Sequence, residues 1–445
     1  MSFSIQKSTQ FVVNELIIVT KAGPIDISAI YDEINIFDSL FTPVMSGNIL
    51  ITDATGLSGS LIFDGSETIL IDISKSKGNP DIANFKKAFR IYKQSDRVKD
   101  GLNSERYILH FCSDEMIYSN QQKINQSYEG TYSHVVEKIL ADYLKIPENQ
   151  AGGFFENTSG IRKIVIPNLK PLEAIEWVAK RALDSKQSPN YFFYQNITGY
   201  NFVSLSKLLT KPELLDITLE LKNTKKTNAI DEISSARALE IITQVDMLQK
   251  VKSGVNAGQF VGFDPITRIT AKKNIGFGDI FSKIEHGGET PNQSVFENRG
   301  GVKSVEAFAS RISMASFGAA KQLSKYIKVQ DPTSISKEES VENWLFQRAA
   351  IIAHLMSKRV KLAMPGNFQL TCGFNIKLTA PSPGKKIKGD DNEDPSLNGK
   401  YIIVASRQMI KRDIHDTVIE VASTTTDNDF VTVSNPSQLK QLLDY

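Results

Sequence analysis

This sequence has few cysteines, no long apolar stretch and no excess of one charge. Only Cys112 and Cys372 occur among the 445 residues, which is too few for a disulfide framework or a cysteine metal site. Each lies in or beside a strand-like pattern, where a cysteine behaves as a small buried hydrophobe. A single disulfide between the two stays open.

No run of the sequence approaches the roughly 20 apolar residues that a membrane-spanning helix needs. The first residues, Met-Ser-Phe-Ser-Ile-Gln-Lys, have neither the apolar core nor the cleavage site of a signal peptide. We therefore expect a protein that is made and used without Sec-type export and that has no membrane partner.

The charges are balanced, with 52 Lys and Arg against 50 Asp and Glu and a formal net charge of +2. A dedicated nucleic-acid binder would instead concentrate Lys and Arg on one face or arm. The densest basic run, residues 384–388, is followed at once by the acidic residues 390–394. This pattern favours a solvated hairpin tip over a phosphate-binding loop.

Motifs of catalysis and metal binding are also missing. The histidines show neither HExxH spacing nor a Gly-x-Ser-x-Gly elbow, and residues 390–394 lack the glycine and the closing Glu of a calcium loop. Residues 276–278 lack the third glycine and the following helix of a nucleotide site. We expect each histidine to be satisfied by a neighbour or to face solvent. The five are His110, His134, His286, His354 and His415.

One polar cluster, Glu285-His-Gly-Gly-Glu289, stays open as a candidate site. Its two carboxylates and the imidazole of His286 could serve hydrolysis or hold a metal ion. A Gly-Gly turn flanked by polar residues is the commoner meaning of such a pattern. The sequence therefore predicts no catalytic residue, no cofactor and no metal ion, and a protein that is not an enzyme.

A strand pattern occurs twice, once near each end of the chain. Residues 68–74, 89–92 and 107–113 alternate apolar and polar positions, and so do residues 374–380, 401–405 and 417–423. Such alternation, with turn residues between the runs, is typical of half-buried antiparallel strands. Because 445 residues exceed the roughly 250 to 300 that one core supports, we expect several domains, two of them related.

The remaining patterns lie between and around these repeats. Further strands are predicted over residues 11–19, 31–37 and 46–52, and over 238–245, 258–264 and 266–270, the latter three pairing with the C-terminal set. Helices are predicted over residues 131–144, from Pro171 to about residue 182, and over 341–356. In the last, Trp344, Leu345, Arg348, Ile352, Leu355 and Met356 fall at helical spacing. A hairpin is predicted over residues 191–205, turning at Asn196 to Gly199.

Three stretches in this order resemble a known family. The first is the helix from Val341 with residues 357–378, 397–404 and 418–421. The second is the helix from Pro171 with residues 191–203. The third is residues 258–267, which look like a Gly-x-x-x-x-Tyr/Phe-Asp strand ending. They resemble the central baseplate hub of contractile-tailed bacteriophages. The chain departs from that hub in a longer segment, 282–340, and in a charged loop, 381–398.

The resemblance implies an α+β fold of two tail-tube-like antiparallel β-barrel domains with inserted smaller α/β domains. We expect residues 1–114 to form the first barrel, 115–207 a small α/β domain, and 208–281 with 358–426 a discontinuous second barrel. Residues 282–357 would be an inserted loop-rich and helical segment, and 427–445 a C-terminal tail.

The resemblance further implies a homotrimer in which two barrels from each chain build a pseudo-sixfold ring. Such a ring is a symmetry adaptor between the hexameric tail tube and the trimeric spike or needle. DNA and the tape-measure protein would pass through its lumen without specific binding, and baseplate wedge proteins would surround it. We expect the protein in the tail baseplate of the virion, after assembly in the host cytoplasm.

Two alternatives remain. The first is the spike-base protein of a related contractile injection or secretion system; the sequence shows no repeating needle segment after the second barrel, which favours the hub. The second is a tail-associated cell-wall hydrolase, which needs an acid pair in a cleft. Glu285 and Glu289 are poor candidates for that pair because they lie beside flexible glycines.

Overall fold

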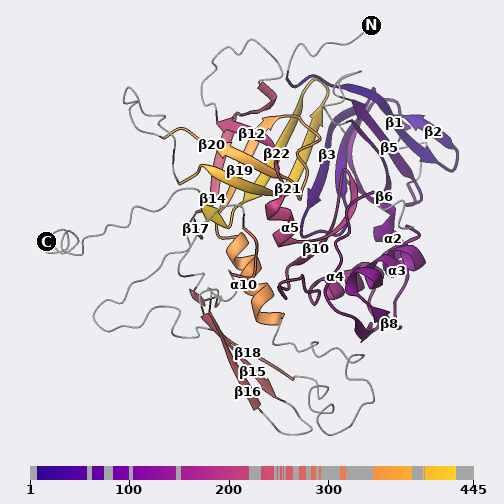
Figure 1. Ribbon diagram of the computed structural model, residues 1–445. Coiled ribbons are helices and arrows are strands. Elements are labelled where there is room, and N and C mark those ends of the chain that lie inside the picture. Colours follow the sequence, from indigo (N-terminus) through magenta and orange to yellow (C-terminus); the bar gives the residue numbers. More distant parts are fainter. Residues whose placement is uncertain are drawn as a thin grey trace.

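The structure is a computed structural model in which most of the chain is described. The described residues are 8–57, 63–74, 84–99, 104–146, 152–219, 232–244, 248, 251–252, 254, 257–263, 270–276, 282–286, 290–291, 311–316, 344–382, 394 and 396–426. In these residues antiparallel β-sheet dominates, and the α-helices are few (Figure 1). One sheet contains 14 strands.

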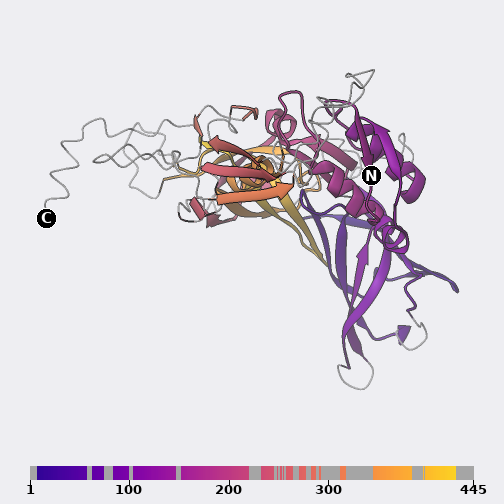
Figure 2. The ribbon, with the colours of Figure 1, turned by 90° about the horizontal axis from the view of Figure 1, so that it is seen from below.

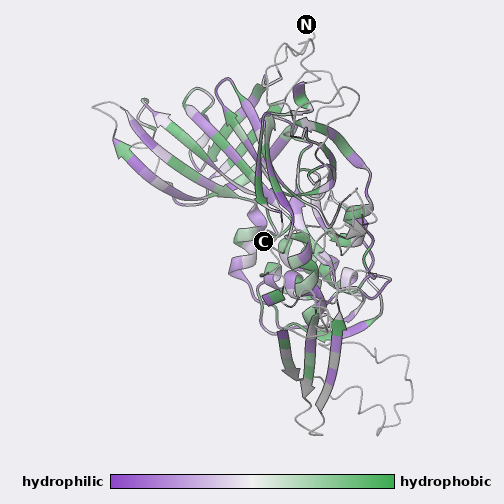
Figure 3. Ribbon diagram, turned by 90° about the vertical axis from the view of Figure 1, so that its left-hand side faces the viewer, coloured by the Kyte–Doolittle hydropathy of each residue, from purple (hydrophilic) through white to green (hydrophobic). Residues whose placement is uncertain are grey.

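The first unit of this sheet is antiparallel throughout, in the order β3-β4-β7-β6-β5-β1-β2. Hydrophobic and hydrophilic residues alternate along its strands (Figure 3), so one face packs into a core of Ile, Leu and Phe side chains. The predicted strands of this region are confirmed. Their bounds are β1 Val12–Thr20, β2 Gly23–Asp26, β3 Tyr31–Ser39, β4 Ser46–Asp53, β5 Thr68–Ser74, β6 Phe85–Lys99 and β7 Glu105–Cys112.

The second unit is built from two separate parts of the chain. Its pairings run β14-β19-β22-β21-β20-β12-β13. The chain continues from β13 into β14, and between them Arg237 N donates to Ala363 O of β19 (2.8 Å). The bounds are β12 Glu213–Leu219, β13 Ser235–Ala236, β14 Ala238–Thr243, β19 Arg359–Pro365, β20 Asn375–Thr379, β21 Gly399–Lys411 and β22 His415–Ala422.

Five strands of each unit have the same order and the same antiparallel pairing. In the first unit the order is β3-β4-β7-β6-β5, and in the second it is β14-β19-β22-β21-β20. Even an irregularity repeats, because β6 shifts register against β7 after Ile91, and β21 shifts against β22 after Ile403. At both places the backbone N–H before the shift donates to a carbonyl oxygen on the other side of the long strand. Ile91 N donates to Glu67 O, just before β5, and Ile403 N donates to Phe374 O, just before β20. The outer strands differ, since β12 pairs parallel with β20 whereas β1 pairs antiparallel with β5.

Strand β21 joins the two units into one sheet. Its first half pairs with β20, from Leu378↔Gly399 to Asn375↔Ile402. Its second half leaves β20 and pairs antiparallel with β3, from Ala405↔Ser39 to Lys411↔Glu33. Figure 2 shows the two bundles of strands, indigo to purple and orange to yellow, meeting along this strand pair.

A small α/β domain lies between the units in sequence. The predicted helix over 131–144 is confirmed, and Thr131 caps it by accepting a hydrogen bond from His134 N. The helix from Pro171 and the hairpin over 191–204 are also confirmed, the latter with Asn196 paired to Gly199. The elements are α2 Asp114–Gln121, β8 Ser127–Gly130, α3 Tyr132–Leu144, β9 Arg162–Val165, α4 Pro171–Ala179, β10 Tyr191–Asn196, β11 Gly199–Ser204 and α5 Leu205–Thr210.

A separate three-stranded sheet corrects one prediction. Residues 258–264 were expected to pair with the C-terminal strands, and this is wrong. Strand β15 (Ala257–Phe263) pairs instead with β16 (Thr270–Gly276) and, in parallel, with β18 (Arg311–Ser316). The helix that contains Phe346 also lies against β15. The Phe346 ring occupies the space that a Cβ at Gly258 would need. Only β14 of the predicted set joins the C-terminal strands, through β19.

Helix α10 (Leu345–Leu355) confirms the prediction of a helix but not of its face. Of the residues expected at helical spacing, only Leu355 is fully buried. The buried side chains are Phe346, Gln347, Ala350, Ile351, His354 and Leu355. The helix is apolar on most of its circumference and packs against several neighbours, so spacing alone did not identify the inner face.

Some predictions lie outside the described residues. These are the strand over 266–270 except its last residue, most of the inserted segment 282–340 including Glu289, most of the loop 381–398 and the tail 427–445. Two short strands, β17 (Thr290–Pro291) and β23 (Thr425–Thr426), pair with each other. Among the helices that are described, none has the length and apolarity that crossing a membrane requires.

Candidate functional site

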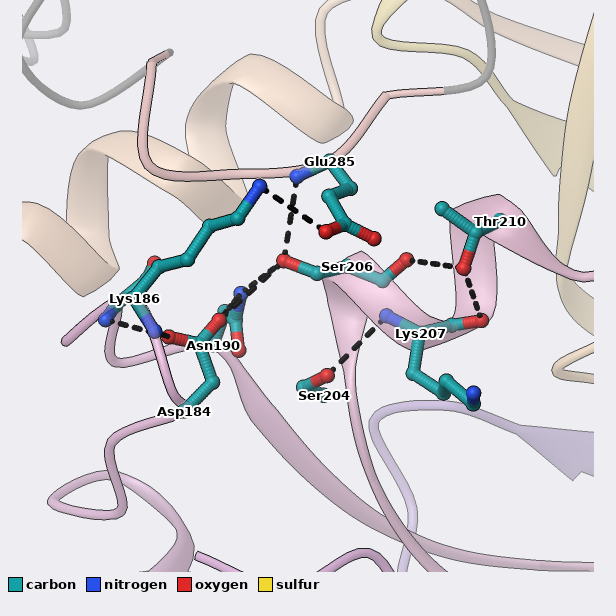
Figure 4. A network of polar contacts seen from close by, with 9 residues as sticks. Asp184, Lys186, Asn190, Ser204, Ser206, Lys207, Thr210 and Glu285 are labelled. Atoms are coloured by element: carbon teal, nitrogen blue, oxygen red, sulfur yellow. Dashed lines mark hydrogen bonds and ion pairs between the residues drawn. The ribbon is translucent and has the colours of Figure 1, made fainter. Parts of the chain in front are cut away.

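The Glu285 cluster is the first place to look for chemistry, and its described part is a surface ion pair. The Glu285 carboxylate lies 3.0 Å from Lys186 Nζ, and the Glu285 side chain is 49% exposed. Its backbone N–H donates to Ser206 Oγ at 3.4 Å (Figure 4). His286 contacts Thr424 Oγ1 at 3.3 Å. The Glu285 contacts fasten this segment to the small domain, and the His286 contact fastens it to the residues after β22. The second predicted acid, Glu289, lies outside the described residues.

The polar network beneath Glu285 holds a turn. Asp184 accepts hydrogen bonds from the backbone N–H groups of Lys186 and Ser188, both at 2.9 Å, and from Asn190 Nδ2 at 3.2 Å (Figure 4). Asn190 Nδ2 also donates to Ser206 Oγ at 2.9 Å. Ser206 Oγ in turn donates to Asp184 Oδ2 at 3.4 Å. The network therefore fixes the loop between α4 and β10.

Each histidine lies beside a neighbouring polar or charged group. His354 is buried and its Nε2 lies 3.1 Å from Thr424 O, and His415 Nε2 lies 2.9 Å from Gln408 Oε1. His110 Nε2 contacts Ser95 Oγ at 2.8 Å, and His134 lies beside Glu137. No group of three His, Cys, Asp or Glu side chains in the described part of the chain could hold a metal ion. Cys112 and Cys372 are buried and free, so the disulfide left open by the sequence is not formed.

The pairing of β21 residues 405–411 with β3 residues 33–39 is called the unit seam below, and it contains a network of specific polar contacts. Near one end of the unit seam, where Asp38 pairs with Ser406, lies the buried carboxylate of Asp38. It accepts hydrogen bonds from Thr371 Oγ1 (2.7 Å), Cys372 N (2.9 Å) and Ser406 Oγ (2.9 Å). One side chain of the first unit thus fixes two segments of the second. Burial raises the pKa of Asp38, and the three hydrogen bonds oppose that rise.

The opposite face of the unit seam is polar and partly exposed. Arg407 donates from Nε to Asn35 Oδ1 at 2.8 Å and pairs with Glu33 at 3.3 Å. Lys411 lies 3.7 Å from the same carboxylate. Because these ion pairs are in contact with water, they add little stability. They do favour one alignment of β21 against β3.

Helix α10 forms a second junction through Arg348. Its guanidinium donates to Tyr191 O at 2.8 Å and to Ala179 O and Pro189 O at 3.4 Å, so it ties α10 to the small domain. Burial lowers the pKa of Arg348 to about 10, which leaves it charged at neutral pH. Nearby, Arg181 stacks between the rings of Trp177 and Trp344, at 3.7 and 4.6 Å from their centroids.

Replacing Arg348 by Met is expected to loosen this junction. Three buried carbonyls would lose a charged donor, at a cost of about 1.5–3 kcal/mol. The chain has two tryptophans, both beside Arg181, so their fluorescence during urea unfolding should report the loss. Arg348→Lys, which keeps a charged donor, is the matched control and should lose less. Equal stability of Arg348→Met and the unchanged protein would contradict this role.

No protein-family profile and no curated protein sequence matches this chain. Solved structures do match over nearly its full length. The tail protein from Neisseria meningitidis MC58 superposes with a TM-score of 0.52 at 10% sequence identity, over 93% of this chain and 97% of that one. The 43 kDa tail protein of prophage MuSo2 from Shewanella oneidensis superposes with a TM-score of 0.52 at 9% identity, over 92% and 98%.

This chain has the fold of a phage tail protein. The resemblance predicted from the sequence is therefore confirmed at the level of the fold. Both units and the small domain are included, because each superposition covers more than nine tenths of the chain. Identities near 10% transfer no individual residue, so the roles of Asp38 and Arg348 rest on their contacts alone.

Sequence reasoning missed both of these residues. Asp38 stands in a strand among apolar neighbours, and an acid in such a run is a weak signal of a buried carboxylate with fixed donors. Arg348 was noted only for its helical spacing. Their partners lie far away in sequence, which no local pattern reveals.

Proposed function

We propose that this protein is the structural hub of a phage tail baseplate. Three chains form a ring in which the two units of each chain give six similar elements around one axis. The ring joins the hexameric tail tube to the trimeric spike, and its lumen is the conduit for DNA and the tape-measure protein. In this proposal each unit is a tube-like barrel, and the protein resides in the virion tail after assembly in the host cytoplasm.

The observation behind this proposal is the repetition of one strand order, with the same register shift, in both units. A duplicated element lets a threefold assembly present six similar surfaces to a sixfold partner. The pairing of β13 with β12 and the Arg237 bond to Ala363 favour closure of the second unit on itself. The domain limits proposed from the sequence are kept, with β15 and β16 assigned to a small sheet of their own.

A structural role fits the contacts better than hydrolysis. Glu285 forms an ion pair with Lys186 instead of facing a second acid among the described residues. The two tail proteins that share the fold are named for their place in a tail. Between a phage hub and the spike base of an injection machine we favour the hub, since the two superpositions given above, with TM-scores of 0.52, are to tail proteins.

Purified protein is expected to be a trimer, alone or with its spike partner. Multi-angle light scattering at several concentrations measures this directly, and the 49.5 kDa chain should give three times its own mass. Tail tube protein added to the trimer should bind at its sixfold face. A monomer at the highest concentration, with and without the spike protein, would refute the ring.

A further inference from the structure

One lysine of the first unit lies on the core face of its sheet. Along β6, Phe85, Phe89 and Ile91 share this face, and each is at most 2% exposed. Lys87 lies at the same phase of the alternation, and its partner across the sheet is Ile71 of β5, which is fully buried. An amine in such surroundings loses hydration that apolar side chains do not replace.

The contacts of the Lys87 amine are apolar instead of ionic. Its Nζ donates weakly to Met45 Sδ at 3.6 Å and lies 5.7 Å from the centroid of the Phe89 ring. Lys87 has no ion pair within the described residues. The adjacent Lys86 points to the other face, where its amine pairs with Asp72 at 2.7 Å. The two neighbouring lysines therefore have different chemical surroundings.

Two acidic groups act on the Lys87 amine from beyond ion-pair distance. They are Glu115, in the first turn of α2, and Asp38 of β3. Burial lowers the pKa of Lys87 to about 8, and the two acids oppose that fall. A lysine in water has a pKa of about 10.4. At pH 7 about a tenth of the Lys87 amine is then neutral, against less than about one part in a thousand for a lysine in water.

The Lys87 side chain also keeps a route to solvent. It is half-buried, whereas Phe85 and Phe89 on either side of it are buried. A small molecule can therefore approach the amine from the solvent side. The Met45 and Phe89 side chains beside Nζ favour an apolar molecule over a polar one.

We propose that Lys87 is a nucleophilic lysine, at which small apolar aldehydes form an imine with Nζ. The lone pair of the neutral amine attacks the carbonyl carbon and forms a C–N bond. The carbonyl oxygen takes up the two amine protons and leaves as water, so the step needs neither an oxidant nor a reductant. This site goes beyond the hub function and does not depend on it.

Labelling of the unchanged protein tests the site. Benzaldehyde with sodium cyanoborohydride, which supplies hydride, turns the imine into a stable benzylamine that peptide mass spectrometry locates. Lys93 is the internal reference, because it is exposed on the same strand. At pH 7, labelling at Lys87 should be at least about tenfold faster than at Lys93, since the larger neutral fraction outweighs slower access to a half-buried amine.

The pH dependence is measured with 2,4-dinitrofluorobenzene, an apolar reagent that reacts with free amines. The rate at Lys87 should level off above its pKa of about 8. Glu115→Gln removes a carboxylate that holds this pKa up, so labelling of Lys87 at pH 7 should become faster while that of Lys93 stays the same. Lys87→Arg keeps the charge and should abolish the label at this position.

Two results would overturn the proposal. One is labelling of Lys87 no faster than that of Lys93, and the other is a Lys87 rate that still rises above about pH 9. Either result leaves the hub function standing, because light scattering on unlabelled protein measures ring formation separately.

Discussion

Leu378→Asp should yield insoluble protein. Leu378 is fully buried on β20, among Ile376, Val360 and Tyr401 in the core of the second unit. An aspartate there would place an unpaired carboxylate among apolar side chains. The penalty of several kcal/mol is comparable to the whole stability of many domains, about 5–15 kcal/mol. The soluble fraction after expression, compared with the unchanged protein, measures the effect.

Lys377→Asp is the matched control, one residue away on the other face. Lys377 is exposed and pairs across the sheet with Asp216 and Lys400. Its charge reversal costs at most about 1 kcal/mol, as is usual for surface charges. The variant should therefore stay folded, although its assembly can suffer. If Lys377→Asp aggregated while Leu378→Asp stayed soluble, the register of β20 would be off by one residue.

The strands and their faces could be predicted because period-two alternation is a local signal. The alternation over residues 374–380 puts Ile376 and Leu378 on one face, and both are fully buried. The opposite face was expected to be polar, and Lys377 is exposed there. Asn375 of the same face is buried, however, because its amide donates to Leu208 O and Lys211 O at 2.8 Å each. A polar residue was thus assigned to the correct face, but its burial depends on a partner 164 residues away.

Strand partners were harder to predict than strands. The expectation that residues 258–264 would join the C-terminal strands rested on proximity in sequence. Their partner β18 lies some 50 residues further on and pairs in parallel, and nothing in either sequence specifies that match. The length of β6 was also missed, since beyond Tyr92 all of its residues except Val98 are polar.

The polar junctions were beyond sequence reasoning for the same reason. Asp38 and its donors Thr371 and Ser406 are separated by more than 300 residues. Each of them alone is an ordinary polar residue in or near a strand. Only the docking of the two units brings the hydroxyls to the carboxylate, so the unit seam became visible only in three dimensions.

Removing the Asp38 carboxylate is expected to weaken the contact between the two units. Asp38→Ala would leave the N–H of Cys372 and the hydroxyls of Thr371 and Ser406 buried without their acceptor. At about 1–3 kcal/mol for each unsatisfied group, we expect a loss of at least 3 kcal/mol in the free energy of unfolding. Urea denaturation followed by circular dichroism measures this loss. Unchanged stability would show that Asp38 does not hold the unit seam.

Asp38→Asn is the matched control, and it separates charge from hydrogen bonding. The amide oxygen can accept from Cys372 N, and the amide N–H groups can donate to the two hydroxyls, so this variant should remain folded. Because burial raises the pKa of Asp38 in the folded protein, ionisation is more costly there than in the unfolded chain. The contribution of the acid is therefore fully present below its unfolded pKa, about 3.9, and is lost as the pH rises through the folded value. The unfolding free energy of the unchanged protein minus that of Asp38→Asn should therefore fall as the pH is raised above about 4. A difference that rises instead would mean that the three hydrogen bonds lower the pKa of Asp38 by more than burial raises it.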